Sequence, residues 1–184
     1  MSELDFSADE DVQINLVKSN GYAIRLIENP SAAVQLEAVK EHPYAIQYIK
    51  NPSESLKLLA VKLNPSVFKY MENPSDEIKL EVVKKNGYNI KLVKNPSEDV
   101  QIAAVQQNGL ALPLIKNPSE AVQIEAVKNT SQAYRYVTSY NVLMATKECW
   151  DNKFYYFLTE NCFKLTEEQT SEIKTIYNTL QLFK

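Results

Sequence analysis

The sequence contains few of the residues that build metal sites, phosphate-binding loops and nucleophilic active sites. Its 184 residues include one His, two Cys and three Gly. Cys149 and Cys162 are too far apart for the short Cys-x-x-Cys spacing of a zinc site. The glycines, at positions 21, 87 and 109, are too dispersed to form a phosphate-cradling loop. We therefore expect no catalytic residues, no cofactor and no metal ion.

The chain also lacks a basic excess and a long apolar segment. Its 20 Lys and Arg against 23 Asp and Glu give a formal net charge of −3, whereas nucleic-acid-binding domains are usually basic. No apolar run approaches the roughly 20 residues needed to cross a membrane. The acidic N-terminus lacks the basic and apolar zones of a signal peptide, and two Cys without a disulfide framework fit a reducing compartment. We expect a cytoplasmic protein that makes no membrane contact.

What the chain does contain is an Asn-Pro-Ser motif that recurs every 22 residues, beginning at positions 29, 51, 73, 95 and 117. We number the positions of each repeat from this Asn as position 1. Residues 7–9 are then a degenerate copy of the motif at the start of a first repeat. Position 11 is Val in every copy, and positions 6, 8, 18 and 21 are large and apolar or aromatic. Such agreement at a fixed period indicates a repeat architecture. The six repeats are 7–28, 29–50, 51–72, 73–94, 95–116 and 117–138.

Each repeat predicts two short helices. Ser at position 3 is a favourable N-cap for a first helix over positions 4 to 13. A second helix of about two turns begins at position 14, which is usually Asn, and ends at the next Asn-Pro, because Pro disfavours helix in the residue before it. Asn64-Pro65-Ser66, which is out of register, starts one of these second helices, and Pro113 inside another predicts a kink or a shorter helix. Helices this short need their neighbours for stability.

The period fades after residue 138, so we divide the chain into a repeat region, 1–138, and a helical capping region, 139–184. Residues 141–149 are expected to form the first helix of a degenerate seventh unit. Thr166 to Gln169 reads as a capping box, and the helix that follows is interpreted as a structural cap, with docking of a partner as the alternative. An aromatic cluster is expected to cover the last repeat and consists of Trp150, Phe154, Tyr155, Phe157 and Leu158. The last helix has one apolar side, which is formed by Ile173, Ile176, Tyr177 and Leu180.

Residues 117–128, Asn-Pro-Ser-Glu-Ala-Val-Gln-Ile-Glu-Ala-Val-Lys, resemble the units of leucine-rich repeat variant proteins and, less closely, HEAT-like repeats. They also look like helical repeats of uncharacterised bacterial and phage proteins. The resemblance covers residues 7–138, although the period is slightly shorter than in those families and the cysteine cluster of the variant family's iron–sulfur module is missing. It implies a right-handed α-solenoid that presents a concave surface to a partner. We predict an all-α, right-handed α-solenoid of six 22-residue two-helix repeats with a C-terminal helical cap.

Two polar columns are interpreted as structural. Position 7, which is Gln or Lys, is expected to bond to the backbone of the adjacent repeat, and His42 is expected to replace Asn as a helix cap. Position 12 is Lys in five repeats, which is consistent with a basic ridge or with a face neutralised by Glu three residues earlier. We favour the neutralised face, with the pairs Glu37–Lys40, Glu81–Lys84 and Glu125–Lys128.

The second helices carry the candidate binding residues, at positions 16, 19 and 20. Tyr and Arg are enriched at binding hot spots because they combine a large contact area with a polar tip. Packing of the same tyrosines between repeats is an equally good explanation. The candidates are Tyr22, Arg25, Tyr44, Gln47, Tyr48, Lys69, Tyr70, Tyr88, Lys91, Arg135 and Tyr136.

The predicted function is therefore that of a non-enzymatic scaffold that binds another protein along the second helices. The resemblance implies a phage- or bacterium-encoded adaptor or inhibitor. The alternative is a nucleic-acid-binding HEAT-like module that uses the concave groove and the lysine column. A catalytic role for His42 is disfavoured because no column of nucleophiles accompanies it.

Overall fold

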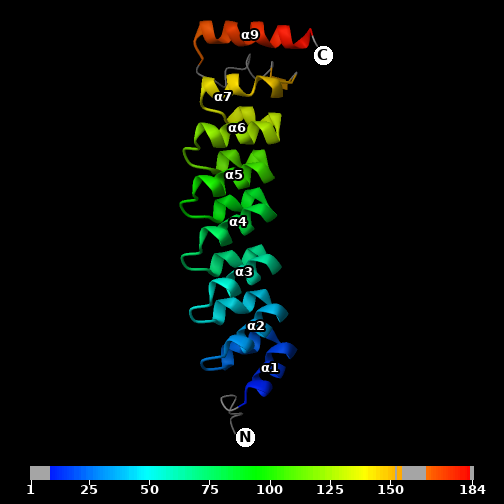
Figure 1. The fold of residues 1–184 in the computed structure, drawn as a ribbon, viewed down its shortest axis with the longest axis vertical. Helices are drawn as coiled ribbons and strands as arrows, with labels where there is room; N and C mark the ends of the chain where they lie inside the picture. Colours follow the sequence, from blue (N-terminus) through cyan, green and yellow to red (C-terminus); the bar gives the residue numbers. More distant parts are fainter. Residues whose placement is uncertain (1–8, 152, 155–164, 183–184) are drawn as a thin grey trace. The chain divides into compact units, whose positions relative to one another are not determined.

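The computed structural model describes residues 9–151, 153–154 and 165–182, and these residues form an all-α solenoid (Figure 1). Pairs of helices repeat with the predicted 22-residue period, and the described residues contain no β-strand. The chain divides into two compact units, Met1–Val82 and Val83–Lys184, which we call unit 1 and unit 2. The division into a repeat region and a capping region at residue 138 stays a prediction.

The first helix of every repeat is an α-helix of ten residues that covers positions 4 to 13, as predicted. Ser accepts a hydrogen bond from the position-6 N–H in several repeats, for example at 3.3 Å from Val34 N to Ser31 Oγ. This bond satisfies one of the free N–H groups of the first turn. The helices are α1 Glu10–Ser19, α2 Ala32–Glu41, α3 Glu54–Leu63, α4 Asp76–Lys85, α5 Glu98–Gln107 and α6 Glu120–Asn129.

The second helix of every repeat is a 3-10 helix of six residues, shorter and tighter than the α-helix expected from the sequence. The position-14 carbonyl accepts the first i→i+3 bond, for example from Ala23 N to Asn20 O at 2.9 Å. Pro113 does not shorten its helix, which has six residues like the others, because Pro has a φ compatible with a 3-10 helix and removes one bond only. The helices are η1 Gly21–Leu26, η2 Pro43–Tyr48, η3 Pro65–Tyr70, η4 Gly87–Leu92, η5 Gly109–Leu114 and η6 Ser131–Tyr136.

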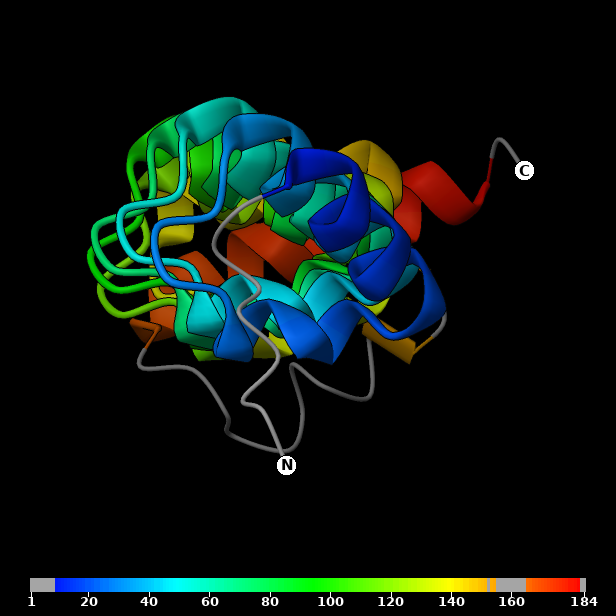
Figure 2. The ribbon, with the colours of Figure 1, turned by 90° about the horizontal axis from the view of Figure 1, so that it is seen from below.

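The turns between repeats depend on a left-handed Asn at position 1. The φ values of Asn29, Asn51, Asn73, Asn95 and Asn117 lie between 46° and 52°. Asn tolerates this region far better than other residues with a side chain, which confirms the interpretation of this column as turn chemistry. In unit 1 the turns lie on the same side of the helices (Figure 2, blue to cyan).

The conformation of Asn117 allows a direct test. We expect Asn117→Val to lower the free energy of unfolding by about 2 kcal/mol, because a β-branched side chain is strained at a φ of 51°. Asn117→Gly should change it by less than about 0.5 kcal/mol, since Gly adopts this φ without strain. Urea unfolding followed by circular dichroism measures both values. Equal effects of the two substitutions would show that the φ at this turn does not limit the choice of residue.

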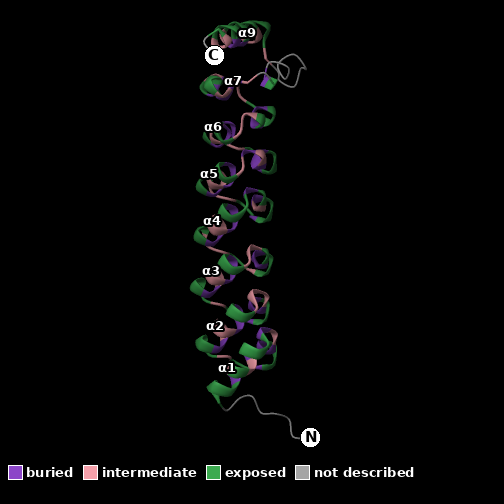
Figure 3. Cartoon of the chain, turned by 90° about the vertical axis from the view of Figure 1, so that its right-hand side faces the viewer, coloured by how far each residue is buried: buried purple, intermediate pink, exposed green. Residues whose placement is uncertain are grey.

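Packing between neighbouring repeats builds the core. In unit 1, α2 packs against α1 and α3, and η2 packs against η1 and η3; in unit 2, α5 packs against α6, and η5 packs against η4 and η6. The position-11 Val is at most 1% exposed in all six repeats, whereas position 8 is only half-buried. Within each unit the buried residues lie on the sides of helices that face their neighbours (Figure 3).

Hydrogen bonds between the N-terminal ends of successive α-helices also join the repeats. The hydroxyl of Ser31 donates to Glu10 Oε1 of the preceding repeat, and Ser119 donates to Glu98 Oε1 in the same way. The hydrogen bond from Ser75 likewise contributes to the lowered pKa of Glu54, after the larger effect of Lys57. In these three repeats the capping Ser therefore also links the repeat to the one before it, a role that was not predicted from the sequence.

The region after the repeats begins with α7 Tyr140–Ala145 and the 3-10 turn η7 Lys147–Cys149, in place of one helix over 141–149. Trp150 and Phe154 stack with ring centroids 4.4 Å apart, and the edge-to-face contact of Phe154 with Tyr134 joins them to η6. Tyr155, Phe157 and Leu158 lie outside the described residues.

The final helix, α9 Glu167–Gln181, begins with the predicted capping box between Thr166 and Gln169. Ile173 and Tyr177 are buried, and Ile176 and Leu180 are half-buried, so its apolar side is largely covered. In the described part of the chain, no helix has both the length and the apolar composition needed to span a bilayer.

Candidate functional site

The second helices expose at least one large apolar or aromatic side chain per repeat, at position 20. Positions 18 and 21, which are one 3-10 turn apart, are buried in almost every repeat, whereas position 20 is exposed. We call these residues the position-20 row. In unit 1 they are Leu26, Tyr48 and Tyr70, which are 60%, 42% and 40% exposed, and in unit 2 they are Leu92, Leu114 and Tyr136, which are 40%, 42% and 42% exposed.

Three of these residues were predicted as candidates and three were missed. Tyr48, Tyr70 and Tyr136 were predicted from their residue type. The leucines were not predicted, because Leu in a helical repeat usually belongs to the core. The leucines could have been predicted from their position. Position 20 is Leu or Tyr in every repeat and lies between the two core columns, 18 and 21.

The structure brings the tyrosines of unit 1 together. Tyr22 meets Tyr48 edge-to-face with ring centroids 6.2 Å apart, and Tyr44 meets Tyr70 at 6.0 Å. Position 16 of one repeat therefore contacts position 20 of the next. Lys69 Nζ lies 4.8 Å from the centroid of the Tyr70 ring, a cation–π distance. The rings both pack between repeats and keep exposed surface.

The other candidates are distributed over both units. Arg25 and Gln47 are exposed on η1 and η2, and Gln47 Nε2 donates to the carbonyl of Tyr44 at 3.0 Å. In unit 2, Tyr88 and Lys91 are exposed on η4, and Arg135 and Tyr136 are exposed on η6.

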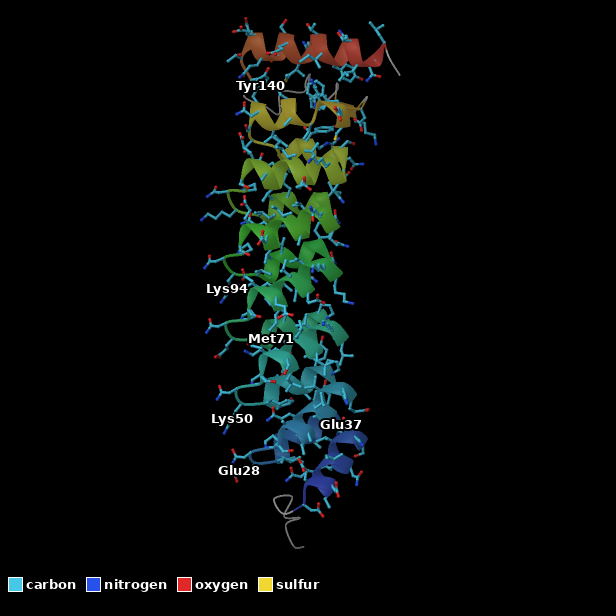
Figure 4. The ribbon with its side chains drawn as sticks, in the orientation of Figure 1. Glu28, Glu37, Lys50, Met71, Lys94 and Tyr140 are labelled. Atoms are coloured by element: carbon cyan, nitrogen blue, oxygen red, sulfur yellow. The ribbon has the colours of Figure 1, made fainter. Side chains whose placement is uncertain are left out.

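A pocket of about 450 Å³ lies in unit 1 where η1 ends and the second repeat begins. Leu26 and Tyr48 of the position-20 row line it, together with the cations Arg25 and Lys50 and the acid Glu28. Glu28 and Lys50 project from consecutive turns on one side of the helices (Figure 4). The pocket combines apolar surface with charged groups of both signs at its edge.

Two lysines of the α-helix column, Lys40 and Lys128, are paired with acids on their own helices. Lys40 Nζ lies 2.8 Å from Glu37 Oε1, and Lys128 Nζ lies 2.9 Å from Glu125 Oε1, as predicted. The hydrogen bond from Lys40 holds the pKa of Glu37 below its usual value. The pKa of Glu125 is also lowered, first by a hydrogen bond from Gln106 and then by Lys128.

Gln106 replaces Lys in this column, and its amide donates to Glu125 of the next repeat at 3.0 Å. The remaining predicted pair, Glu81–Lys84, falls across the boundary between the units.

The position-7 side chains bond within their own repeat, which corrects the expectation of a ladder to the adjacent one. The amides of Gln35, Gln101 and Gln123 donate to the Pro carbonyl five residues earlier at 2.9–3.0 Å. This carbonyl lies within reach of the side chain because the turn folds back against the helix start. Where position 7 is Lys, it pairs with an acid at position 4, as in Lys57–Glu54 at 2.7 Å.

His42 does not act as a side-chain cap, contrary to the sequence interpretation. Its Nδ1 lies 2.7 Å from the carbonyl of Glu41, and its ring meets Tyr22 edge-to-face at 4.7 Å. η2 has no side-chain cap bond, because Nδ1 of His42 is directed at the carbonyl of Glu41 instead of at the N–H groups of the helix. The residues that the structure describes contain no group of three or more His, Cys, Asp or Glu placed to hold a metal ion.

Comparison with protein-family models, with curated proteins and with solved structures gave no significant match.

Proposed function

We propose that this protein is a non-enzymatic scaffold that binds another protein through the exposed side of its second helices. The position-20 row carries the proposal. Ten large apolar or aromatic side chains are exposed in the described residues, and seven of them lie on second helices. Exposed apolar surface concentrated on one set of elements is typical of interaction sites.

The repeat family, the source and the cellular location of the protein are also proposals. The likeness of residues 117–128 to leucine-rich repeat variant and HEAT-like units supports assignment to that group of repeats. The likeness to bacterial and phage repeat proteins supports a phage- or bacterium-encoded adaptor or inhibitor, and the two cysteines without a disulfide framework support a cytoplasmic location. The ion pairs of Lys40 and Lys128 favour a protein partner over a nucleic acid, because they occupy the lysines that phosphates would need.

Tyr48→Ala with Tyr70→Ala should weaken binding of the partner by at least about tenfold, since it removes two contact sites worth about 1 kcal/mol or more each. The free energy of unfolding should fall by only about 1–3 kcal/mol, the value of two edge-to-face pairs. Binding is measured with the captured partner, and stability by urea unfolding. Leu63→Ala, at a 49% exposed site on α3, is the control that should leave binding unchanged. If the double variant is unfolded, these tyrosines are core residues and the proposed face is wrong.

Photo-crosslinking in the source cell identifies the partner. A photoreactive residue at Gln47, which is exposed on η2, should crosslink to a discrete protein, whereas one at Ser55, which is exposed on α3, should not. Crosslinks from Ser55 alone, or to nucleic acid alone, would overturn the proposal.

A further inference from the structure

Unit 2 separates its charges between the two kinds of helix. The second helices and turns of its repeats, residues 86–97, 108–119 and 130–138, contain basic residues and no Asp or Glu. The acids of the fifth and sixth repeats, such as Glu98 and Glu125, lie on α5 and α6. The basic residues on the second helices and turns are all exposed; they are Lys91, Lys94, Lys116 and Arg135.

These four cations differ from Lys128 of α6 in having no ion pair with an acid in the described part of unit 2. Lys128, on α6, is held by Glu125 at 2.9 Å. Cations without partners are available to a ligand without breaking an existing pair.

The same elements expose the apolar residues of unit 2. Leu92, Leu114 and Tyr136 belong to η4, η5 and η6, which pack against one another in sequence order, and Tyr88 is 39% exposed on η4. We call this surface the basic-apolar face, defined by Tyr88, Lys91, Leu92, Lys94, Leu114, Lys116, Arg135 and Tyr136.

We infer that the basic-apolar face binds an acidic segment of another protein that also carries large apolar side chains; this inference rests on the proposed function. Four cations that form no ion pair among the described residues of unit 2 attract an anionic ligand, and the exposed Leu and Tyr side chains of the same helices provide apolar contacts. Two of the three row residues in unit 2 are Leu. Leu cannot stack on a base as aromatic side chains do, so an acidic peptide fits this surface better than a nucleic acid.

The spacing of the repeats specifies the ligand further. Packed helices lie about 8–10 Å apart, so the row offers one apolar contact per layer at about that interval. An extended chain advances about 3.1 Å per residue in the polyproline II conformation, or about 9 Å in three residues. The matching ligand is an extended segment with an apolar side chain at every third residue and acidic side chains between.

The test uses a random peptide library displayed on phage, panned against the full chain at about 50 mM salt, where surface charges are weakly screened. The variant Lys91→Ala with Leu92→Ser removes one charge and one apolar contact from the face. Its control, Lys62→Ala with Leu63→Ser, changes the same dipeptide at exposed positions on α3. Circular dichroism establishes that both variants are folded.

Wild type and control should enrich peptides with an excess of Asp and Glu and recurrent apolar residues. A synthetic peptide from this pool should bind the Lys91→Ala, Leu92→Ser variant at least about tenfold more weakly, and physiological salt should weaken it further. Enriched peptides without an acidic excess that still require Lys91 and Leu92 would overturn the inference and leave the proposed function standing.

Two further outcomes also overturn the inference. Tighter binding of an oligothymidine strand than of the best peptide would assign the face to nucleic acid. No enrichment, together with no protein crosslinked from Gln47, would overturn the proposed function as well.

Discussion

Replacing Trp150 with Ala is expected to lower the free energy of unfolding of unit 2 by about 3–5 kcal/mol, the usual range for truncating a buried aromatic residue. Trp150 is 2% exposed and stacks on Phe154 at 4.4 Å, with an angle of 16° between the ring planes. Phe154 is fully buried and meets Tyr134 of η6 at 5.2 Å. The indole therefore supports the contact that covers the last repeat, and its removal leaves a cavity at that contact.

Urea unfolding followed by circular dichroism measures this effect. Tryptophan fluorescence cannot follow the unfolding of the variant, because Trp150 is the chain's single tryptophan. The control Trp150→Phe keeps an aromatic ring at the site and should cost less than half as much as Trp150→Ala. A cost below about 1 kcal/mol for Trp150→Ala would mean that the aromatic cluster does not support the last repeat.

The second large effect is expected for Gly109→Ala, which should cost about 2–3 kcal/mol through overpacking. A Cβ atom on Gly109 would lie 2.3 Å from the carbonyl oxygen of Ala126 and 2.7 Å from Thr130 Cγ2. The first of these atoms is backbone, so the fifth and sixth repeats have to move apart. The movement stretches the 2.7 Å bond from Gly109 N to Asn129 Oδ1.

Gly87→Ala is the matched variant, because its Cβ would also lie 2.3 Å from a carbonyl oxygen, that of Ala104. The two substitutions should have similar costs in urea unfolding. Leu110→Ala, beside Gly109 in η5, removes side-chain atoms without pushing the repeats apart and serves as the control for general damage to η5. A cost below about 0.5 kcal/mol for both glycine variants would show that the repeats separate freely at this contact.

The α-helices of the six repeats were predictable to the residue because their ends are fixed by local chemistry. Ser at position 3 precedes the α-helix in repeats two to six and caps α2, α3 and α6 with its side chain, and the left-handed Asn with its following Pro separates each of these helices from the preceding repeat. The 3-10 form of the second helices was not predictable in the same way. A six-residue segment of Gly, Tyr, Ala, Ile, Arg and Leu, as in η1, has no local signal that distinguishes a 3-10 helix from two turns of α-helix.

Contacts between repeats were the other part that the sequence concealed, because their partners are about 20 residues apart. Gly87 N donates to Gln107 Oε1 and Gly109 N donates to Asn129 Oδ1, so position 15 of one repeat meets position 13 of the next. Where position 15 is Pro43, which has no N–H, position 13 of the following repeat is Leu63, which cannot accept a hydrogen bond. This pairing becomes visible only when columns of adjacent repeats are compared with each other.

Comparison of the columns would also have been needed to predict the leucines of the candidate site. The leucines of the position-20 row were missed because the prediction selected tyrosines and cations one repeat at a time. Positions 18 and 21 face the core and position 20 is exposed, although position 17, one 3-10 turn before it, is buried in five repeats. The helix type alone therefore does not identify the exposed column.

The Ser–Glu hydrogen bonds between repeats affect how the number of repeats can change in evolution. Glu98 accepts from Ser119, and Glu10 accepts from Ser31, so an acid near the start of one repeat meets the cap of the next in both units. A duplicated copy of residues 95–116 would meet each neighbour with the same complementary groups. Recombination that inserts or deletes one 22-residue copy can therefore lengthen or shorten the protein by a whole repeat. Each such event would change the number of exposed position-20 side chains by one.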